Sequence, residues 1–266
     1  MIAVKTGCTF YHFKEADALS SVLIEVCCGS ADDVIQAKLA GADRVELNSD
    51  LFHGGLTPTV GTFRVAKRET GLPIMTMIRP REGGFCYTEA EFAVCLEDTR
   101  ALLDAGADGL VFGFLHEDGR IDTERTRQLA ELALSAGKEA VFHRAIDVVP
   151  DWREAIDQLA ELHITRILTS GQEPDVAYGT ETVRQMIEYA RGRIQILPGA
   201  GITRQNAARI IAETGADQIH VAAHRSLFDR SVENNRAIFY GGCLYPPEDR
   251  FSMIDREAIS AIAENV

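Results

Sequence analysis

Acidic, basic and imidazole side chains lie within or directly after short apolar runs of this chain. Glu25 and Glu46 lie within two such runs, while Arg79 and His143 each follow another. This set is suited to general acid–base chemistry on a small polar ligand, with Arg79 as the partner of an anion or a carbonyl group. Two glutamates and two histidines, the second being His220, are equally suited to hold a divalent metal ion. The sequence leaves the two chemistries open.

These residues also share a direction, because side chains alternate between the two faces of a strand. Glu25 shares a face with Cys27, and His143 shares one with Asp147. Charged groups are expensive to bury without partners, so we expect these faces to meet at one polar mouth. A purely structural Glu–Arg pair is the competing interpretation. The candidate catalytic residues are Glu25, Glu46, Arg79, His143, Asp147 and His220.

The elements that must position these residues follow from glycines that end helices. Six of the apolar runs follow Gly41, Gly71, Gly106, Gly137, Gly192 and Gly215. Arg166–Thr169, which follows His163, and Leu23–Val26 complete eight predicted strands. The junctions lie roughly 23–35 residues apart, about the length of one βα unit. Eight such units predict an α/β fold, the (β/α)8 TIM barrel, whose chemistry lies at the carboxyl ends of the strands.

The chain divides into a single barrel domain with two flanking segments. Residues 1–21 precede the first strand as an N-terminal arm, residues 22–226 form the barrel, and residues 227–266 form a tail that we expect to pack on it. Pro246 and Pro247 interrupt the tail, and the pattern predicts a last helix over Arg256–Glu264.

Composition excludes several classes of function. The 266-residue chain has a net charge of −13, which argues against general binding to nucleic acid or an anionic membrane surface. No run of 18 apolar residues is present, so we expect no membrane span. Six cysteines without a Cys-x-x-Cys motif are typical of a reducing compartment. We expect a cytoplasmic protein.

Glycines after the seventh strand suggest an anion site. Gly199 and Gly201 would free backbone N–H groups, and a helix starting at Thr203 would direct its dipole at the ligand. Barrels often bind phosphate between the loops after strands seven and eight. A plain tight turn is the alternative. The candidate anion-binding residues are Ser170, Gly199, Gly201, Thr203 and Arg225.

Several motifs in order resemble the CutC copper homeostasis family. They include Gly41–Leu47, Gly54–Pro58, Met77–Arg81, Phe142–Asp147 and Pro198–Ile202. The similarity runs from about residue 22 to residue 226. It implies a TIM barrel, an association with copper binding and tolerance, and self-association as a homo-oligomer, either a dimer or a tetramer.

The resemblance also implies a metal ligand. The copper proposal for the family depends on cysteines at the ends of strands one and two. Cys27 matches the first position, whereas Asn48 stands where the pattern has a second cysteine. Cu(I) prefers thiolate ligands, so we expect Cys27 to be the main ligand of a modest copper site. Two functions follow: a copper homeostasis protein, or a barrel enzyme acting on a small anionic or phosphorylated metabolite.

Overall fold

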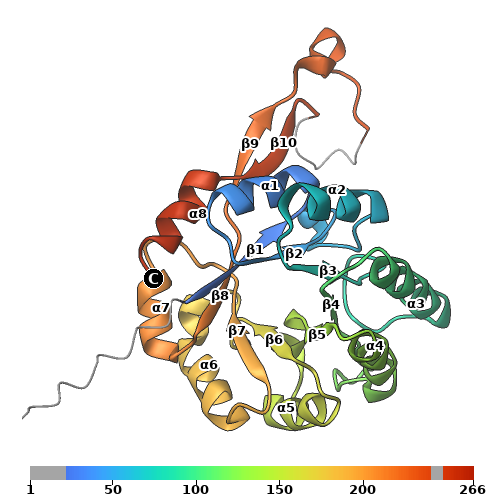
Figure 1. Ribbon diagram of the computed structural model, residues 1–266, viewed down its shortest axis with the longest axis vertical. Helices are drawn as coiled ribbons and strands as arrows, with labels where there is room; N and C mark the ends of the chain where they lie inside the picture. Colours follow the sequence, from blue (N-terminus) through green and yellow to red (C-terminus); the bar gives the residue numbers. More distant parts are fainter. Residues whose placement is uncertain (1–21, 241–247) are drawn as a thin grey trace, which may run out of the picture.

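The computed structural model describes residues 22–240 and 248–266, and it confirms the predicted (β/α)8 TIM barrel. Eight parallel strands surround a central axis, and helices form the outer ring (Figure 1). The barrel strands are β1 Leu23–Cys28, β2 Arg44–Leu47, β3 Ile74–Met77, β4 Gly109–Phe112, β5 Glu139–Phe142, β6 Arg166–Thr169, β7 Gln195–Pro198 and β8 Gln218–Val221. The expected arm, residues 1–21, lies outside the described residues.

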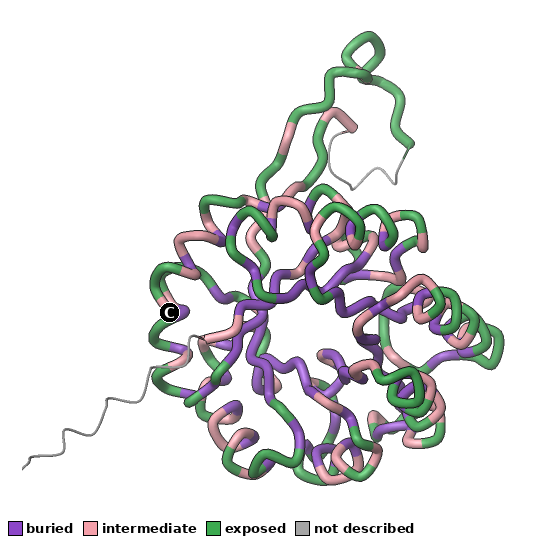
Figure 2. The backbone as a smooth tube through the Cα atoms, in the orientation of Figure 1, coloured by how far each residue is buried: buried purple, intermediate pink, exposed green. Residues whose placement is uncertain are grey.

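The strands pair in the order β7-β6-β5-β4-β3-β2-β1-β8. A parallel bridge between Gly199 and His220 joins the two ends of this order, so the sheet closes. The strands are almost wholly buried while the helices expose their outer faces (Figure 2). This is the burial expected of a parallel sheet covered by helices.

The helices that cover the barrel are α1 Ala31–Leu39, α2 Val60–Thr70, α3 Glu89–Asp104, α4 Thr123–Ser135, α5 Trp152–Glu161, α6 Val176–Ala190, α7 Ala207–Thr214 and α8 Arg256–Ala263. The turn after α5 shows why one predicted junction lacks a glycine. His163 takes the left-handed conformation there, with φ 57°, the role that glycine usually has at helix ends.

The segment after β8 contains a feature that periodicity did not predict. β9 His224–Phe228 and β10 Arg250–Ile254 form an antiparallel ribbon that extends away from the barrel (Figure 1). The 3₁₀ helix η3 Arg230–Asn235 lies between them, and α8 follows β10 and packs beside α1. Residues 241–247, which include the two prolines of the tail, lie outside the described residues.

The barrel interior is polar toward the amino ends of the strands and apolar further up. Arg44 donates to Gln218 Oε1 over 3.0 Å, and the buried Arg166 donates to Gln195 Oε1 over 2.9 Å and pairs with Glu139. Above these residues, Met75, Met77, Val111 and Val141 form an apolar cluster. This apolar cluster therefore separates the polar residues at the carboxyl ends of the strands from those at the amino ends.

Candidate functional site

A cavity of about 340 Å³ opens at the carboxyl-terminal mouth of the barrel. Its polar lining is Cys27, Glu46, Arg79, His143, Arg144 and His220. Its apolar lining includes Met77, Phe85, Leu168, Ala200 and Ala222. The structure thus brings together four of the six candidate catalytic residues and the candidate metal ligand.

Glu25 lies beneath the cavity, where it holds His220. The two residues are opposite each other in the β1–β8 pairing, and His220 Nδ1 is 2.8 Å from Glu25 Oε1. The other carboxylate oxygen of Glu25 pairs with Arg44 Nε. Burial alone would raise the pKa of Glu25, but the hydrogen bond from His220 and the charge of Arg44 outweigh it and lower the pKa to about 2. Glu25 is therefore an ionised positioning group.

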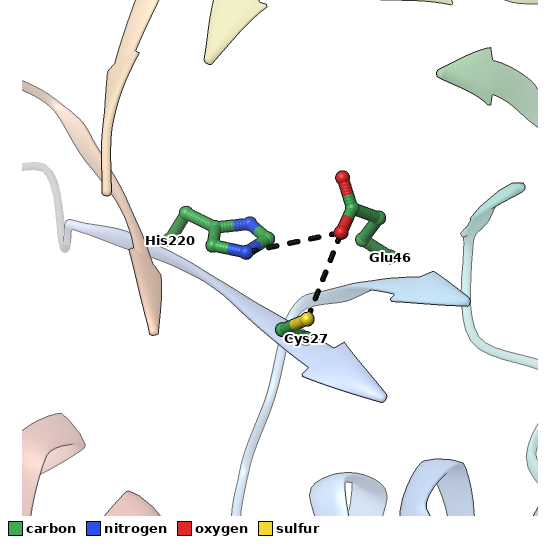
Figure 3. Close-up of side chains that lie close together, drawn as sticks. All are labelled: Cys27, Glu46 and His220. Carbon is green, nitrogen blue, oxygen red and sulfur yellow. Dashed lines mark hydrogen bonds and ion pairs between the residues drawn. The ribbon is translucent and has the colours of Figure 1, made fainter. Parts of the chain in front are cut away.

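Cys27, Glu46 and His220 form a compact group that could hold a metal ion (Figure 3). Their ligand atoms all lie within 4.8 Å of one another. Glu46 Oε2 is 3.7 Å from Cys27 Sγ and 3.9 Å from His220 Nε2. Metal bonds of about 2.0–2.3 Å place neighbouring ligands roughly 3.5 Å apart at tetrahedral angles, so a small inward shift would allow all three to bind.

The protonation of this group follows from its burial and its charges. Burial raises the pKa of the Cys27 thiol to about 12, against the opposing effect of His220. Burial also raises the pKa of Glu46. For His220, burial lowers the pKa, but the charge of Glu46 and the hydrogen bonds with Cys27 and Glu25 outweigh it and raise the pKa well above 6.5. Without a metal, the group holds a thiol beside an imidazolium.

Asn48 occupies the position of the second expected cysteine and contacts the same group. Its Nδ2 donates to Glu46 Oε2 over 2.9 Å and approaches Cys27 Sγ at 3.6 Å. Gly55 permits this arrangement, because a Cβ there would meet Asn48 Oδ1 at 2.5 Å. The amide thus supplies hydrogen bonds to the group and no sulfur.

His143 lines the cavity from the end of β5. Its Nδ1 accepts a hydrogen bond from the Ala145 backbone N–H over 3.1 Å, which leaves the ring proton of the neutral form on Nε2. Burial and the positive charge of Arg79 lower the pKa of His143 to about 3. The low pKa makes His143 a neutral ring. Since Nδ1 already accepts a hydrogen bond, the ring can offer a ligand only the donor at Nε2.

Arg79 is both a loop anchor and part of the cavity lining. Its Nη1 donates to the carbonyl oxygens of His53 (3.0 Å) and Gly55 (2.9 Å), and its Nη2 donates to that of Gly83 (2.8 Å). The guanidinium carbon lies 5.6 Å from the centroid of the Phe85 ring. Arg79 thereby ties the loops after β2 and β3 together at the mouth.

Asp147 and Ser170 do not line the cavity. The predicted strand alternation ends at His143, because Arg144–Val148 form the 3₁₀ helix η2, so Asp147 does not share the direction of His143. Asp147 accepts hydrogen bonds from Thr169 Oγ1, the Ser170 hydroxyl and Arg144 Nε. This corrects the expected grouping: Asp147 and Ser170 join the loops after β5 and β6, and Arg144 lines the cavity instead.

The predicted anion loop is arranged differently from the expectation. The helix begins at Ala207 and not at Thr203, whose N–H already donates to Asn206 Oδ1 over 2.7 Å. The Gly199 N–H donates to the Thr169 carbonyl, and the Asp175 carboxylate packs against Gly201. Arg225 lies on β9 and lines a separate 590 Å³ cavity between the β9–β10 ribbon and the barrel. These residues therefore do not form one site.

Two residues important for the cavity were missed from the sequence. Phe85 lies with its ring centroid 4.7 Å from that of His143. Gly113, directly after β4, packs against the same imidazole, because a Cβ there would meet His143 Nδ1 at 2.6 Å. The signal for Gly113 was its place at a strand end, where a missing side chain makes room for a neighbour.

Fold and site together define a class: a (β/α)8 barrel with a buried cysteine–glutamate–histidine group at its carboxyl-terminal mouth. The family model of the CutC family matches residues 22–225. The chain belongs to the CutC family.

Relatives and solved structures agree with this assignment. The chain is 49% identical over 248 residues to a family protein CutC of Treponema denticola, covering 93% of this chain and 100% of that protein. It is 39% identical over 256 residues to the copper homeostasis protein cutC homolog of Homo sapiens, covering 95% of this chain and 93% of that protein. The crystal structure of CutC from Streptococcus agalactiae is 36% identical, with a TM-score of 0.71, over 75% of this chain and 97% of that one.

More distant structures share the fold alone. The 3-hexulose-6-phosphate synthase of Salmonella typhimurium has a TM-score of 0.55 at 16% identity, over 91% of this chain and 97% of that one.

Membership in the CutC family favours the copper homeostasis interpretation over the acid–base enzyme. In the described ranges, no helix is long and apolar enough to span a membrane.

Proposed function

We propose that this protein serves copper homeostasis by binding a copper ion as Cu(I) at the mouth of the barrel. Cys27 Sγ is the main ligand, with His220 Nε2 and the Glu46 carboxylate beside it. The observation that carries this proposal is the convergence of three potential ligand atoms within 4.8 Å at the end of three strands. Copper homeostasis is the role named for the human relative.

The surroundings of His220 are those of a metal ligand. A ligating histidine usually donates its other ring N–H to a carboxylate, which fixes the orientation of the ring. Glu25 accepts from His220 Nδ1 in this manner, which leaves Nε2 directed toward Glu46 and Cys27. The donor set also explains why the affinity should be modest. Cu(I) prefers soft thiolates, and the group has one cysteine where a tighter site would have two.

Competition with a Cu(I)-specific chelator under anaerobic conditions tests this proposal. We expect Cys27→Ser to abolish most of the Cu(I) binding, because it removes the only thiolate of the group. Cys86→Ser is the matched control, since Cys86 is exposed and lies outside the group. Tight binding that survives Cys27→Ser would overturn the proposal and move the site to another cysteine.

We also propose that the protein is a homo-oligomer and, from the free cysteines Cys27, Cys28, Cys86 and Cys95, that it works in the reducing cytoplasm. The β9–β10 ribbon and the segment after η3 expose large apolar side chains, namely Phe228, Phe239, Tyr240 and Phe251, which are 45–79% accessible. A two-stranded ribbon is marginally stable by itself, and contact with a second copy would cover these rings. Light scattering on Phe239→Ser and Tyr240→Ser tests the proposal: lower mass supports it, and a wild-type protein that is monomeric at all concentrations refutes it.

A further inference from the structure

Three buried polar atoms without partners belong to residues that line the mouth cavity. They are Glu46 Oε1, Arg79 Nε and His143 Nε2. Their residues are only 3%, 7% and 4% exposed. Buried polar groups in folded proteins are nearly always hydrogen-bonded, because leaving one unpaired costs about 1–3 kcal/mol. Three such atoms in residues that line one cavity indicate a ligand that, with a small shift of these side chains, supplies the missing partners.

Two of the three atoms are donors. His143 Nε2 carries the ring proton, because Nδ1 accepts from the Ala145 N–H. Arg79 Nε carries one hydrogen that the loop carbonyls leave unused, and the guanidinium also interacts with the Tyr87 hydroxyl. Both groups border the Phe85 ring, at 4.7 Å for the His143 centroid and 5.6 Å for the Arg79 guanidinium carbon. This wall of the cavity therefore offers two donors and one fixed positive charge.

Glu46, on the strand β2 that neighbours β3, offers an acceptor. Glu46 uses Oε2 for its contacts with Asn48 and Cys27, and Oε1 is left without a partner. A hydroxyl or amino group of a ligand would satisfy that oxygen. The lining also contains apolar side chains, including Met77 and Leu168. The cavity thus fits a molecule that accepts at one end and donates at the other.

Charge and size restrict the ligand further. Of the cations in the lining, Arg144 pairs with Asp147 and His220 with Glu25, so among the described residues Arg79 is the lining cation that no carboxylate pairs. In the loop after β7, the Gly199 and Thr203 N–H groups are already engaged, by the Thr169 carbonyl and by Asn206 Oδ1. A singly charged carboxylate is matched to this arrangement, and a phosphate dianion is not. The volume of 340 Å³ is at the small end for ligand cavities, about 300–1,000 Å³.

We propose that the mouth cavity binds a small carboxylate that also carries a hydroxyl or amino group. The carboxylate accepts from His143 Nε2–H and Arg79 Nε–H, and the hydroxyl or amino group donates to Glu46 Oε1. His143 and Arg79 follow β5 and β3, whereas Glu46 on β2 is shared with the proposed copper site, so the subsite is tested on the metal-free protein.

Calorimetry on the metal-free full chain, with a copper chelator present, tests this inference. The probes are glycerate, malate and serine, with propionate, glycerol and inorganic phosphate as the comparison set. We expect at least one of the first three to bind about tenfold or more tightly than every member of the comparison set, since a hydrogen bond to a charged group contributes about 1.5–3 kcal/mol. Equal binding of both sets, tighter binding of phosphate, or no binding by any probe would overturn the proposal.

The variant His143→Phe keeps the aromatic contact with Phe85 and removes the donor. We expect it to weaken binding of the preferred probe about tenfold or more, whereas His116→Phe, at an exposed histidine outside the cavity, should leave binding unchanged. If His143→Phe does not fold, imidazole NMR of the wild type decides instead: addition of the probe should shift the His143 Nε2–H signal. An unchanged signal under saturating probe, or undiminished binding by a folded His143→Phe, would refute the assignment.

Discussion

His220 Nδ1 and Glu25 Oε1 lie 2.8 Å apart, at positions paired directly between the last strand of the barrel and the first. The contact connects residues separated by 195 positions in the chain. Since both side chains are almost fully buried, the imidazole has little freedom to rotate. Its orientation toward Cys27 and Glu46 is therefore fixed by closure of the barrel, before any metal binds.

The first prediction concerns this pair. Glu25→Gln keeps the shape of the side chain but removes the charge that orients His220, and we expect Cu(I) affinity to fall about 10–100-fold, the usual effect of losing such a partner. Arg44 would also lose its buried ion pair, so the free energy of unfolding should fall by about 3–5 kcal/mol. Chelator competition and urea unfolding measure the two effects. Wild-type affinity in a folded Glu25→Gln protein would refute the positioning role.

The second prediction concerns the asparagine at the expected cysteine position. Asn48 Nδ2 lies 3.6 Å from Cys27 Sγ, so Asn48→Cys should place a second thiolate beside the first. We expect Cu(I) affinity to rise by about tenfold or more, equivalent to about 1.4 kcal/mol. Ser49→Cys is the matched control, because the Ser49 hydroxyl donates to the Thr57 carbonyl and lies outside the metal group. Equal affinities of the two variants would contradict the assigned site.

Periodicity was enough to predict the barrel because each strand is a short apolar run that opens one βα unit. It also placed Glu46, Arg79, His143 and His220 at the mouth, since strand alternation is local. It failed where the backbone leaves the strand. Asp147 lies in a 3₁₀ helix, so alternation no longer applies, and Arg225 lies on a ribbon whose partner strand follows some twenty residues later. Such pairing depends on tertiary contacts that a local pattern does not contain.

The third prediction is the acid dependence of stability that His143 contributes. Burial and Arg79 lower its pKa from 6.5 to about 3 in the folded protein, so the unfolded chain binds the proton first as the pH falls. The contribution of His143 is complete above pH 6.5 and is lost toward pH 3, at about 1.4 kcal/mol per pH unit. Urea unfolding of the wild type and His143→Phe, compared at pH 7 and pH 5, measures it.

The difference between the wild type and His143→Phe is the quantity to measure, because the pKa of His220 is shifted in the opposite direction. His220 therefore adds to the stability of the folded protein as the pH falls to 6.5. His220 is present in both proteins, so its effect cancels in the difference. We expect the stability of the wild type relative to His143→Phe to decrease between pH 7 and pH 5. A pH-independent difference would show that His143 titrates normally in the folded protein, and imidazole NMR would then give a pKa near 6.5.

The last prediction tests how the histidine is held. Gly113 packs against the His143 ring, and a Cβ at this position would lie 2.6 Å from Nδ1 and 2.9 Å from Ala145 Cβ. These distances are too short for real contacts, so Gly113→Ala should displace the imidazole and break its hydrogen bond with the Ala145 N–H. Overpacking of this kind costs about 1–3 kcal/mol of stability. Because burial is the main cause of the low pKa of His143, a displaced imidazole with more access to water should have a pKa that rises from about 3 toward 6.5. Gly61→Ala is the control, since a Cβ there would meet only Thr59 at an ordinary 3.7 Å. Imidazole NMR across pH 3–8 distinguishes the outcomes, and a His143 signal identical in Gly113→Ala and wild type would refute the role of Gly113.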